Sequence, residues 1–480
     1  MSRESLAVHE RVEALRASLV GSVLVEDNTI QVQDETRLKG EVLDWLVRDA
    51  VFAAGEVQVT ARWLIWELGQ VLGIKPASIH GLYTARGRGL VDGFTVPAVN
   101  LRGLTYDAAR ALFRAALKNE VGAFIFEIAR SEIGYTEQRP AEYISSVIAA
   151  ALKEGFRGPL FMQGDHFQIS PKKYAQEPEA ELGAVRDLIG EAIRAGFYNI
   201  DIDTSTLVDL SKPTVDEQQR LNYQLCADLT AYIRKLEPAG VTISVGGEIG
   251  EVGGKNSTEE ELRAFMDGHL RVLKRYGAEL TGLSKISVQT GTSHGGVILP
   301  DGSLAQVRID FDTLQRLSQV AREGYGLSGA VQHGASTLPR EAFHHFPRVG
   351  TAEIHLATGF QNIIYKHEAL PDELRQKIYT YLRQAHADEG KEGQTDEQFI
   401  YKTRKKGFGP FKTEWWTLPQ EVRDQIGQTL EEQFAFLFHK LKVVNTADLV
   451  GQYVRVPTIH KSPGDFAPAG VLEVDKDLAD

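Results

Sequence analysis

Short apolar runs alternate with longer amphipathic segments between about residue 94 and residue 356. The short runs are rich in β-branched and aromatic residues, as expected of buried strands. They are FTVPAV (94–99), GAFIFEI (122–128), GPLFMQ (158–163), FYNIDI (197–202), VTISVGGE (241–248), KISVQTG (285–291), LSGAVQH (327–333) and GTAEIHL (350–356). The segments between them predict helices over residues 105–119, 140–154, 179–195, 215–235, 258–276, 311–323 and 339–346.

This alternation predicts an α/β fold in which eight parallel strands close into a (β/α)8 TIM barrel. A doubly wound open sheet is the alternative that the pattern alone leaves open. Such a sheet normally carries a glycine-rich dinucleotide loop after its first strand. Here the first run is followed by NLRGLT, which lacks that loop, so the barrel is favoured.

The chain has 480 residues, whereas one barrel takes about 250, so we expect additions at both ends. Residues 1–90 predict a mainly helical extension, because apolar residues recur at helical spacing near 40–73. Residues 91–367 form the expected barrel and catalytic domain. Residues 368–480 predict a second helical extension, which includes a basic and aromatic loop.

The composition is that of a soluble globular protein, with 42% hydrophobic and 25% charged residues. The net charge of -12 argues against nucleic acid or an anionic membrane as a partner, although it allows a local basic pocket. The single cysteine, Cys226, cannot form an internal disulfide and is interpreted as a buried core residue. With no targeting segment and no stretch of about 20 apolar residues, a cytoplasmic protein is expected.

Acids and histidines collect where the strand runs end, and in a barrel those ends form the face that carries the active site. Asp201 and Asp203 end the fourth run, and Glu248 ends the fifth. Asp165 and His166 end the third run in the string QGDH.

Three histidines follow three different strands: His166, His294 in GTSHGG and His333 in HGAS. Three imidazoles suit Zn²⁺, or another divalent ion such as Co²⁺ or Mn²⁺, and leave a coordination position for substrate. A lone histidine is more often structural, but the recurrence at strand ends favours metal binding. His355 is left open between the two interpretations.

Glycines flank these histidines, with Gly295 after His294 and Gly334 after His333. A backbone without Cβ atoms can approach a ligand closely. HGASTLP then opens an expected helix, with Ser336 and Thr337 as capping candidates. The helix N-terminus can bind a phosphate, or the two residues can simply cap the helix.

In their order and spacing, these strings resemble the class II fructose-bisphosphate and tagatose-bisphosphate aldolases over roughly residues 94–366. The matching strings are FTVPAVN, GDH, IDIDTS, GGEIGEVGG, GTSHGG and HGAS. The resemblance implies a metal-dependent lyase that reversibly cleaves a phosphorylated ketose, such as fructose 1,6-bisphosphate, into dihydroxyacetone phosphate and an aldehyde. It also implies a homo-oligomer, either a dimer or a tetramer.

The resemblance also implies a role for each matching position. Asp165 would act as acid and base on the substrate hydroxyl, and His166, His294 and His333 would bind the metal. Glu248 would bind the metal in an alternative position or support a ligand. The positions implied to contact substrate or its phosphate are Asn100, Asp203, Gly295, Gly334 and Ser336.

Two segments depart from the family pattern. Lys255 and Asn256 stand where acidic residues follow the paired glycines, and Glu251 or Glu259 would have to replace the acid that moves the carbon-bound proton. After the eighth strand the family shows Asn-x-Asp-Thr, whereas residues 355–358 read His-Leu-Ala-Thr. Thr358 keeps the last position of that pattern and remains a candidate substrate contact.

A basic stretch interleaved with aromatic residues, YKTRKKGFGPFKTEWW, lies in the C-terminal extension. Either it supplies phosphate contacts to this or a neighbouring subunit's site, or it is a solvated loop. Its basic residues are Lys402, Arg404, Lys405, Lys406 and Lys412.

Two other functions stay open from the sequence. The first is a non-catalytic barrel that stabilises a partner tagatose-bisphosphate-type aldolase, because EIARSEIGYTEQRPAEY resembles the accessory subunit of that enzyme. The second is another metal-dependent barrel enzyme, such as a hydrolase that uses metal-bound water.

Overall fold

Eight parallel strands close into a barrel at the centre of the computed structural model, which describes residues 6–26, 29–249, 255–291, 309–467 and 478. Successive strands pair in chain order, and the last strand pairs with the first to close the barrel. The strands are β4 (Val96–Asn100), β5 (Ile125–Ala129), β6 (Gly158–Gln168), β7 (Asn199–Asp203), β8 (Ser244–Glu248), β9 (Lys285–Val288), β10 (Ala330–Gln332) and β11 (Glu353–Leu356). The predicted TIM barrel is confirmed, and each strand lies within or next to the run that predicted it.

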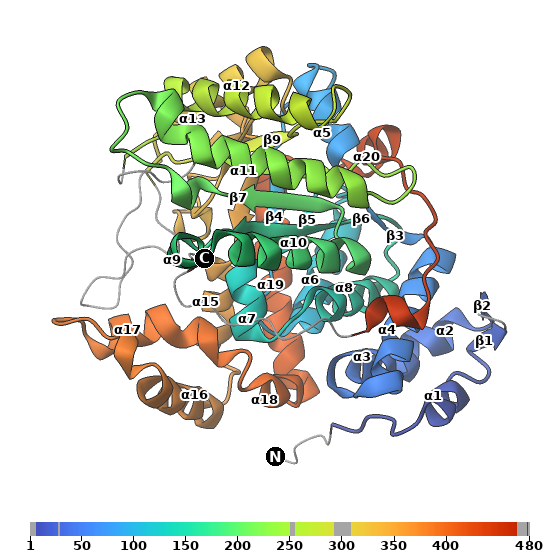
Figure 1. The fold of residues 1–480 in the computed structure, drawn as a ribbon. Helices are drawn as coiled ribbons and strands as arrows, with labels where there is room; N and C mark the ends of the chain where they lie inside the picture. The colour runs from blue at the N-terminus through green and yellow to red at the C-terminus, as the bar shows by residue number, and fades with distance from the viewer. Residues whose placement is uncertain (1–5, 27–28, 250–254, 292–308, 468–477, 479–480) are drawn as a thin grey trace.

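Helices surround the barrel on its outside (Figure 1). Those between the strands are α6 (Thr105–Lys118), α7 (Arg130–Thr136), α8 (Pro140–Glu154), α9 (Pro171–Gln176), α10 (Pro178–Ala195), α11 (Val215–Leu236), α12 (Glu259–Tyr276), α13 (Phe311–Tyr325) and α14 (His345–Arg348). The helix expected over 339–346 is wrong: residues 340–344 form turns, and only the short α14 follows them.

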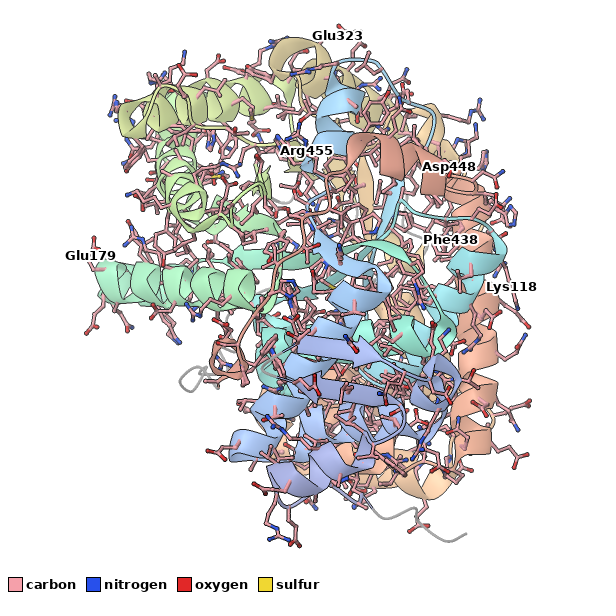
Figure 2. All side chains as sticks on the ribbon, turned by 90° about the vertical axis from the view of Figure 1, so that its right-hand side faces the viewer. Lys118, Glu179, Glu323, Phe438, Asp448 and Arg455 are labelled. Carbon is pink, nitrogen blue, oxygen red and sulfur yellow. The ribbon has the colours of Figure 1, made fainter. Side chains whose placement is uncertain are left out.

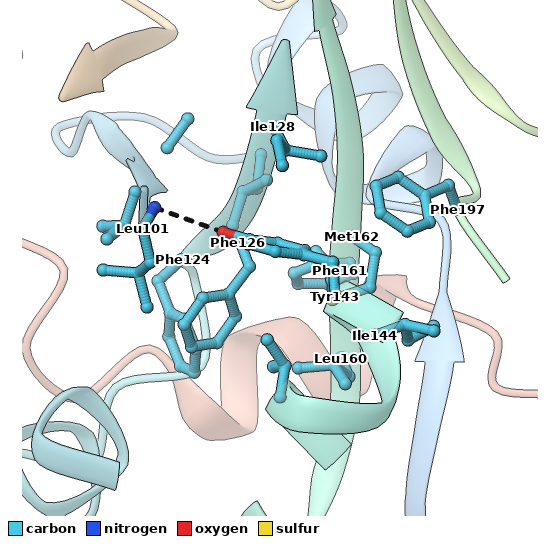
Figure 3. Close-up of a cluster of buried hydrophobic side chains, with 14 of the residues drawn as sticks. Leu101, Phe124, Phe126, Ile128, Tyr143, Ile144, Leu160, Phe161, Met162 and Phe197 are labelled. Atoms are coloured by element: carbon cyan, nitrogen blue, oxygen red, sulfur yellow. Dashed lines mark hydrogen bonds between the residues drawn. The ribbon is translucent and has the colours of Figure 1, made fainter. Parts of the chain in front are cut away.

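The core between strands and helices is dense in aromatic side chains (Figure 3). Phe124 and Phe126 of the β5 segment pack edge to face, with their ring centroids 5.9 Å apart. Tyr143 of α8 reaches the same layer, where its hydroxyl accepts a hydrogen bond from Leu101 N and donates one to Glu127 O. Burying each such ring stabilises the fold by about 1.5–3 kcal/mol, and the tyrosine also fixes α8 against two strand ends.

The chain before the barrel adds helices and one further strand. Its elements are α1 (Val12–Ser18), the hairpin β1 (Val23–Glu26) and β2 (Thr29–Val32), α2 (Glu35–Arg37), α3 (Leu43–Phe52), α4 (Gly55–Leu72), β3 (Ile74–Ala77) and α5 (His80–Gly87). Strand β3 pairs in parallel with the first half of β6. Helix α5 then directs Tyr83 into the barrel, where its hydroxyl bonds to Glu353.

Helices after the barrel cover a second flank, and the chain then returns to the N-terminal helices. They are α15 (Thr358–Lys366), α16 (Asp372–Ala385), α17 (Asp396–Thr403), α18 (Lys412–Trp416), α19 (Gln420–Leu441) and α20 (Ala447–Tyr453). Figure 2 shows α19 with Phe438 beside Lys118 of α6, and Glu179 and Glu323 projecting outward. Beyond α20, the backbone oxygens of Ile459 and Lys461 accept hydrogen bonds from Trp66 and Trp63 of α4.

None of the helices in the described part of the chain combines the length and the apolar character that crossing a membrane requires.

Candidate functional site

A bulge in β6 places Asp165 and His166 at the centre of the barrel. The β6–β7 register runs through Gly164 opposite Ile200 and then Phe167 opposite Ile202, so two residues face one. His166 has a φ of 39°, in the left-handed region that a non-glycine residue rarely adopts. Bulges re-aim side chains next to active sites, and this one brings two consecutive polar residues toward the same centre.

His166 and His333 face each other across the barrel. His166 Nε2 lies 3.0 Å from His333 Nδ1, and the ring centroids are 4.1 Å apart. On its other side, His166 Nδ1 lies 3.1 Å from Asp203 Oδ2 and 3.1 Å from Glu248 Oε2. His333 Nε2 lies 3.0 Å from Ser287 Oγ. The polar atoms behind each ring therefore fix its orientation.

His355 lies next to this pair on β11. Its ring centroid is 4.0 Å from that of His333. Its Nδ1 lies 2.8 Å from Glu127 Oε2 and 3.1 Å from Asp165 Oδ1, while its Nε2 lies 2.8 Å from Glu353 Oε1. The structure thus places His355, which the sequence left open, in the same cluster as Asp165 and His333.

A buried lysine lies below the histidines. Lys285 Nζ donates to Asp201 Oδ2 at 2.8 Å, Glu353 Oε1 at 2.5 Å and Gln163 Oε1 at 2.7 Å. The side chain of Lys285 is only 1% exposed. Its pKa is raised, because the attraction of Asp201 and Glu353 for the charged form outweighs the desolvation that lowers it. Lys285 therefore stays charged and holds the side chains of Gln163, Asp201 and Glu353 in place beneath the histidines; we call this group the floor of the site.

The environment of the site lowers the pKa of one carboxyl group, Asp165, and raises the pKa of two others, Glu248 and Glu127. Burial would raise the pKa of Asp165, but His166 and His355 hold it below its ordinary value. Burial and the neighbouring Asp203 raise the pKa of Glu248 to about 7. Burial and the charge of Asp165 raise the pKa of Glu127 to about 8. Such divergence within one cluster is typical of functional sites.

The donor set fits a divalent metal ion. Two groups of described side chains bring ligand atoms within 4.8 Å of one another around His333: one adds His166 and Glu248, the other Asp165 and His355. Imidazole nitrogens with carboxylate oxygens suit Zn²⁺ and its neighbours in the first transition row. The expected third histidine ligand, His294, lies outside the described residues, as does Gly295.

The remaining expected substrate contacts lie at the same ends of the strands. Asn100 ends β4 and donates to Glu132, while its Oδ1 makes no hydrogen bond within the described part of the chain. Asp203 ends β7 and accepts from Gln168. Gly334 has a φ of 68° and precedes a short 3-10 turn at Ala335–Thr337.

Ser336 does not cap a helix, so the capping prediction is wrong. Its hydroxyl instead accepts a hydrogen bond from Ala357 N at 2.7 Å. It thereby joins the loop after β10 to the start of α15, where Thr358 is buried. The two loops are held together directly above the strand ends.

The two segments that depart from the family pattern have local partners. Asn256 donates to Asp310 Oδ2 at 3.1 Å, and Lys255 pairs with Glu261 at 3.2 Å. Glu259, one suggested replacement for the missing acid, forms an ion pair with Arg263 along α12. The other, Glu251, lies outside the described residues.

The basic stretch of the C-terminal extension is not a solvated loop. Arg404 is buried against the rings of Tyr365 and Tyr401, Lys406 pairs with Glu389, and Lys412 pairs with Glu142. Lys405 lies near the end of β4, where burial and then the charge of Arg102 lower its pKa to about 7. Its Nζ lies 5.5 Å from the ring centroid of Tyr135.

The inward-facing residues Glu127, Lys285 and Glu353 were missed by the sequence reasoning. A signal was present, since polar residues recur every second position in NIDID and EIHL, and alternate residues of a strand share one face. Within an apolar run, however, a single polar residue such as Glu127 does not by itself indicate which face of the strand it lies on.

The architecture defines a class before any comparison: a (β/α)8 barrel with a cluster of histidines and carboxylates at the carboxyl ends of its strands, whose ligand atoms lie close enough together to hold a metal ion. The sequence matches the family described as fructose-bisphosphate aldolase class-II over residues 90–406. The chain therefore belongs to the class II fructose-bisphosphate aldolase family, whose members generally depend on a divalent metal. No curated protein matches the sequence significantly.

Solved structures resemble the chain at low sequence identity. A protein from Sinorhizobium meliloti 1021, described as a probable tagatose 6 phosphate kinase, is 17% identical with a TM-score of 0.50, covering 75% of this chain and 98% of its own. Fructose-bisphosphate aldolase from Campylobacter jejuni is 16% identical, with a TM-score of 0.44 and coverage of 78% and 96%. The YdjI aldolase from Escherichia coli K12 is 13% identical, with a TM-score of 0.44 and coverage of 77% and 99%. The first of these similarities supports the fold alone.

Proposed function

We propose that the protein is a metal-dependent aldolase that reversibly cleaves a phosphorylated ketose into dihydroxyacetone phosphate and an aldehyde. The observation that carries the proposal is the placement of Asp165 beside the facing pair His166 and His333, in a chain of this family. Asp165 Oδ1 lies 4.0 Å from His166 Nε2. An acid–base group next to a metal-binding pair is the arrangement that carbon–carbon cleavage next to a carbonyl requires.

Metal binding and proton transfer are assigned to different residues of the site. His166 and His333, together with His294, would hold the metal, with Glu248 as an alternative ligand. When bound, the metal acts as a Lewis acid that polarises the substrate carbonyl. Asp165 removes the proton from the hydroxyl whose carbon becomes the aldehyde. Its lowered pKa keeps it ionised and ready to accept that proton at neutral pH.

The cationic rim at the end of β4 supports a phosphorylated substrate. Arg102 donates to Glu132 Oε1 at 2.7 Å and to Gln361 Oε1 at 3.0 Å, which holds it in place. Lys405, from the C-terminal extension, lies close enough to Arg102 for the charge of Arg102 to lower the pKa of the lysine. Arg102 carries a permanent positive charge, and a phosphate bound beside Lys405 would favour the charged form of that lysine. Fructose 1,6-bisphosphate is therefore the first substrate to test.

Asn100, Gly334, Ser336 and Thr358 complete the proposed contacts with substrate. Asn100 Oδ1, which has no hydrogen-bond partner among the described residues, can accept a hydrogen bond from a sugar hydroxyl. Gly334 and the turn after it can offer backbone N–H groups to a phosphate. Zinc is the proposed metal, with Co²⁺ or Mn²⁺ as the other candidates, and the cytoplasm is the proposed location.

The test is cleavage of fructose 1,6-bisphosphate by the purified protein, before and after EDTA and after restoration with Zn²⁺ or Co²⁺. Asp165→Asn removes the base, whereas Asp209→Asn, in the exposed loop after β7, is the matched control. We expect cleavage that EDTA and Asp165→Asn abolish and that the control keeps. Fully metal-loaded protein that cleaves neither this nor any other phosphorylated ketose would overturn the proposal.

A further inference from the structure

A cavity of about 460 Å³ lies on the flank of the barrel, where both extensions meet it. Its walls come from α4, from the α7–α8 loop and the first turn of α8, from the C-terminal end of α10, and from residues 464–467. Figure 1 shows α4, α8 and α10 together, with the red C-terminal segment beside them. The volume is typical of small-molecule sites, which span about 300–1,000 Å³. None of the described residues that line it belongs to the site at the strand ends.

Arg62 of α4 brings a buried positive charge to the wall of this cavity. The residue is only 6% exposed, and its Nε donates to Ala50 O at 2.8 Å. Within the described part of the chain its two terminal nitrogens make no hydrogen bond, and its ion pair with Glu142 is long, at 3.9 Å. A guanidinium has a planar fork of donors that fits an oxyanion with two oxygens. The fork of Arg62 lacks such an acceptor among the described residues.

The two buried carboxylates of the wall are held by other cations. Glu191 accepts from Arg139 Nε at 2.8 Å and also pairs with Nη2 of the same arginine. Glu142 Oε1 accepts from Lys412 Nζ at 2.8 Å. Burial lowers the pKa of Arg62, and the attraction of Glu142 and Glu191 does not fully restore it. A buried cation that is balanced only in part is costly, and an anion in the cavity would complete the balance.

The rim of the cavity carries polar groups that suit a molecule larger than a bare ion. Arg194, at the exposed C-terminal end of α10, forms no ion pair within the described chain. Glu137 is exposed, and Asp465 is occupied by hydrogen bonds from Ser462. An occupant could therefore place an acidic group on the buried Arg62 and direct its hydroxyl or other polar groups toward the rim.

The cavity wall also adjoins the segment that supports the rim of the barrel. Glu137 and Arg139 flank Gln138, whose Nε2 donates to Leu101 O at 3.3 Å and to Arg102 O at 3.2 Å. An occupant would thus contact the loop that holds the end of β4 in place, although it would lie outside the barrel.

We propose that this cavity binds a small organic anion, through a phosphate or carboxylate group held by Arg62, at a site separate from the one at the strand ends. The two groups share the chemistry that the guanidinium recognises, which is a pair of oxygens in one plane. The site is formed jointly by the barrel and by the two extensions.

The test is calorimetric titration of the full-length protein with inorganic phosphate and, separately, with malonate. Arg62→Met should weaken the binding of at least one of them roughly 10-fold or more, because it removes a charged, bidentate contact. Lys405→Met, at the proposed substrate rim, should leave that binding in place. Arg186→Met, which breaks an ion pair with Asp228 on the outer side of α10, is the matched control and should bind like the wild type. The anion that binds more tightly identifies the group that Arg62 prefers.

A crystal structure of the wild type soaked in each anion protects the test against a variant that fails to fold. We expect the anion within hydrogen-bond distance of both terminal nitrogens of Arg62. Binding that Lys405→Met abolishes and Arg62→Met keeps would overturn the proposal, as would soaked crystals with neither anion at Arg62. The titration needs no cleavage, so a protein that binds the anion but cleaves no ketose would refute only the aldolase function.

Discussion

The two ring nitrogens of His166 face different partners. Nδ1 lies 3.1 Å from Asp203 Oδ2, whereas Nε2 lies 3.0 Å from His333 Nδ1. If Asp203 accepts the Nδ1 proton, Nε2 presents its lone pair to the centre of the barrel. Asp203 is itself held by Gln168 and Ser205, so the orientation of the ring is set before any ligand binds.

Asp203→Asn should therefore weaken metal binding without unfolding the barrel. Loss of a partner behind a histidine ligand typically lowers metal affinity about 10- to 100-fold. Titration of the apoprotein with Zn²⁺ against a competing chelator measures the change. Asp209→Asn, in the exposed loop after β7, should leave the affinity unchanged. Equal affinities for Asp203→Asn and wild type would show that Asp203 does not orient His166.

Lys405→Met should raise the KM for a phosphorylated ketose and leave kcat nearly unchanged. Lys405 lies near Arg102 at the end of β4, and as a contact to the substrate phosphate it should contribute binding in the ground state and the transition state alike. Loss of one charged phosphate contact of about 1.5–3 kcal/mol corresponds to roughly a 10- to 150-fold rise in KM. Steady-state kinetics check this, with Lys402→Met, an exposed lysine of the same stretch, as the control. An unchanged KM would remove Lys405 from the site.

The barrel was predictable from the sequence because its strands are fully buried and its helices are amphipathic. Strand β3 was not predicted, because IKPA is a four-residue segment whose one partner among the described strands, β6, lies more than eighty residues later in the chain. The expected helix over 339–346 failed because Pro339 and Pro347 bound a segment that forms turns, with only a single helical turn at its end.

The site was predictable only where residues follow their strands. Asp165, His166 and His333 stand at strand ends, and topology alone brings such ends together. Glu127, Lys285 and Glu353 lie within strands, where the register decides whether a side chain faces the interior or the helices. The pairing of Ala98 with Ile125 and of Glu353 with Val96 is a tertiary fact that no local pattern shows.

Lys285→Met should lower the free energy of unfolding by about 3–5 kcal/mol, because it leaves the carboxylates of Asp201 and Glu353 buried without their cation. Methionine keeps most of the side-chain volume, so the lost charge is the main change. Urea denaturation measures the effect. Lys377→Met removes an exposed ion pair with Glu414 and should cost no more than about 1 kcal/mol. Equal effects in the two variants would contradict the role of Lys285 as the floor of the site.

His269 of α12 should make the stability of the fold depend on pH. It is 0% exposed, and neither ring nitrogen has a hydrogen-bond partner within the described residues. Burial, aided by the charge of Arg234, lowers its pKa to about 3. An unfolded chain binds the proton near pH 6.5. The native state therefore loses stability as the pH falls from about 6.5 toward 3, by up to about 1.4 kcal/mol per pH unit.

His269→Leu removes this titration and keeps an apolar side chain of similar size. The free energy of unfolding of the variant, minus that of the wild type, should rise by up to about 1.4 kcal/mol for each unit by which the pH falls between 6 and 4. Urea denaturation of both proteins at several pH values gives this difference, in which all other titrating groups cancel. His439→Leu, at an exposed position of α19, controls for loss of an imidazole. A difference that stays constant with pH would mean that water or another partner accommodates the charged ring of His269.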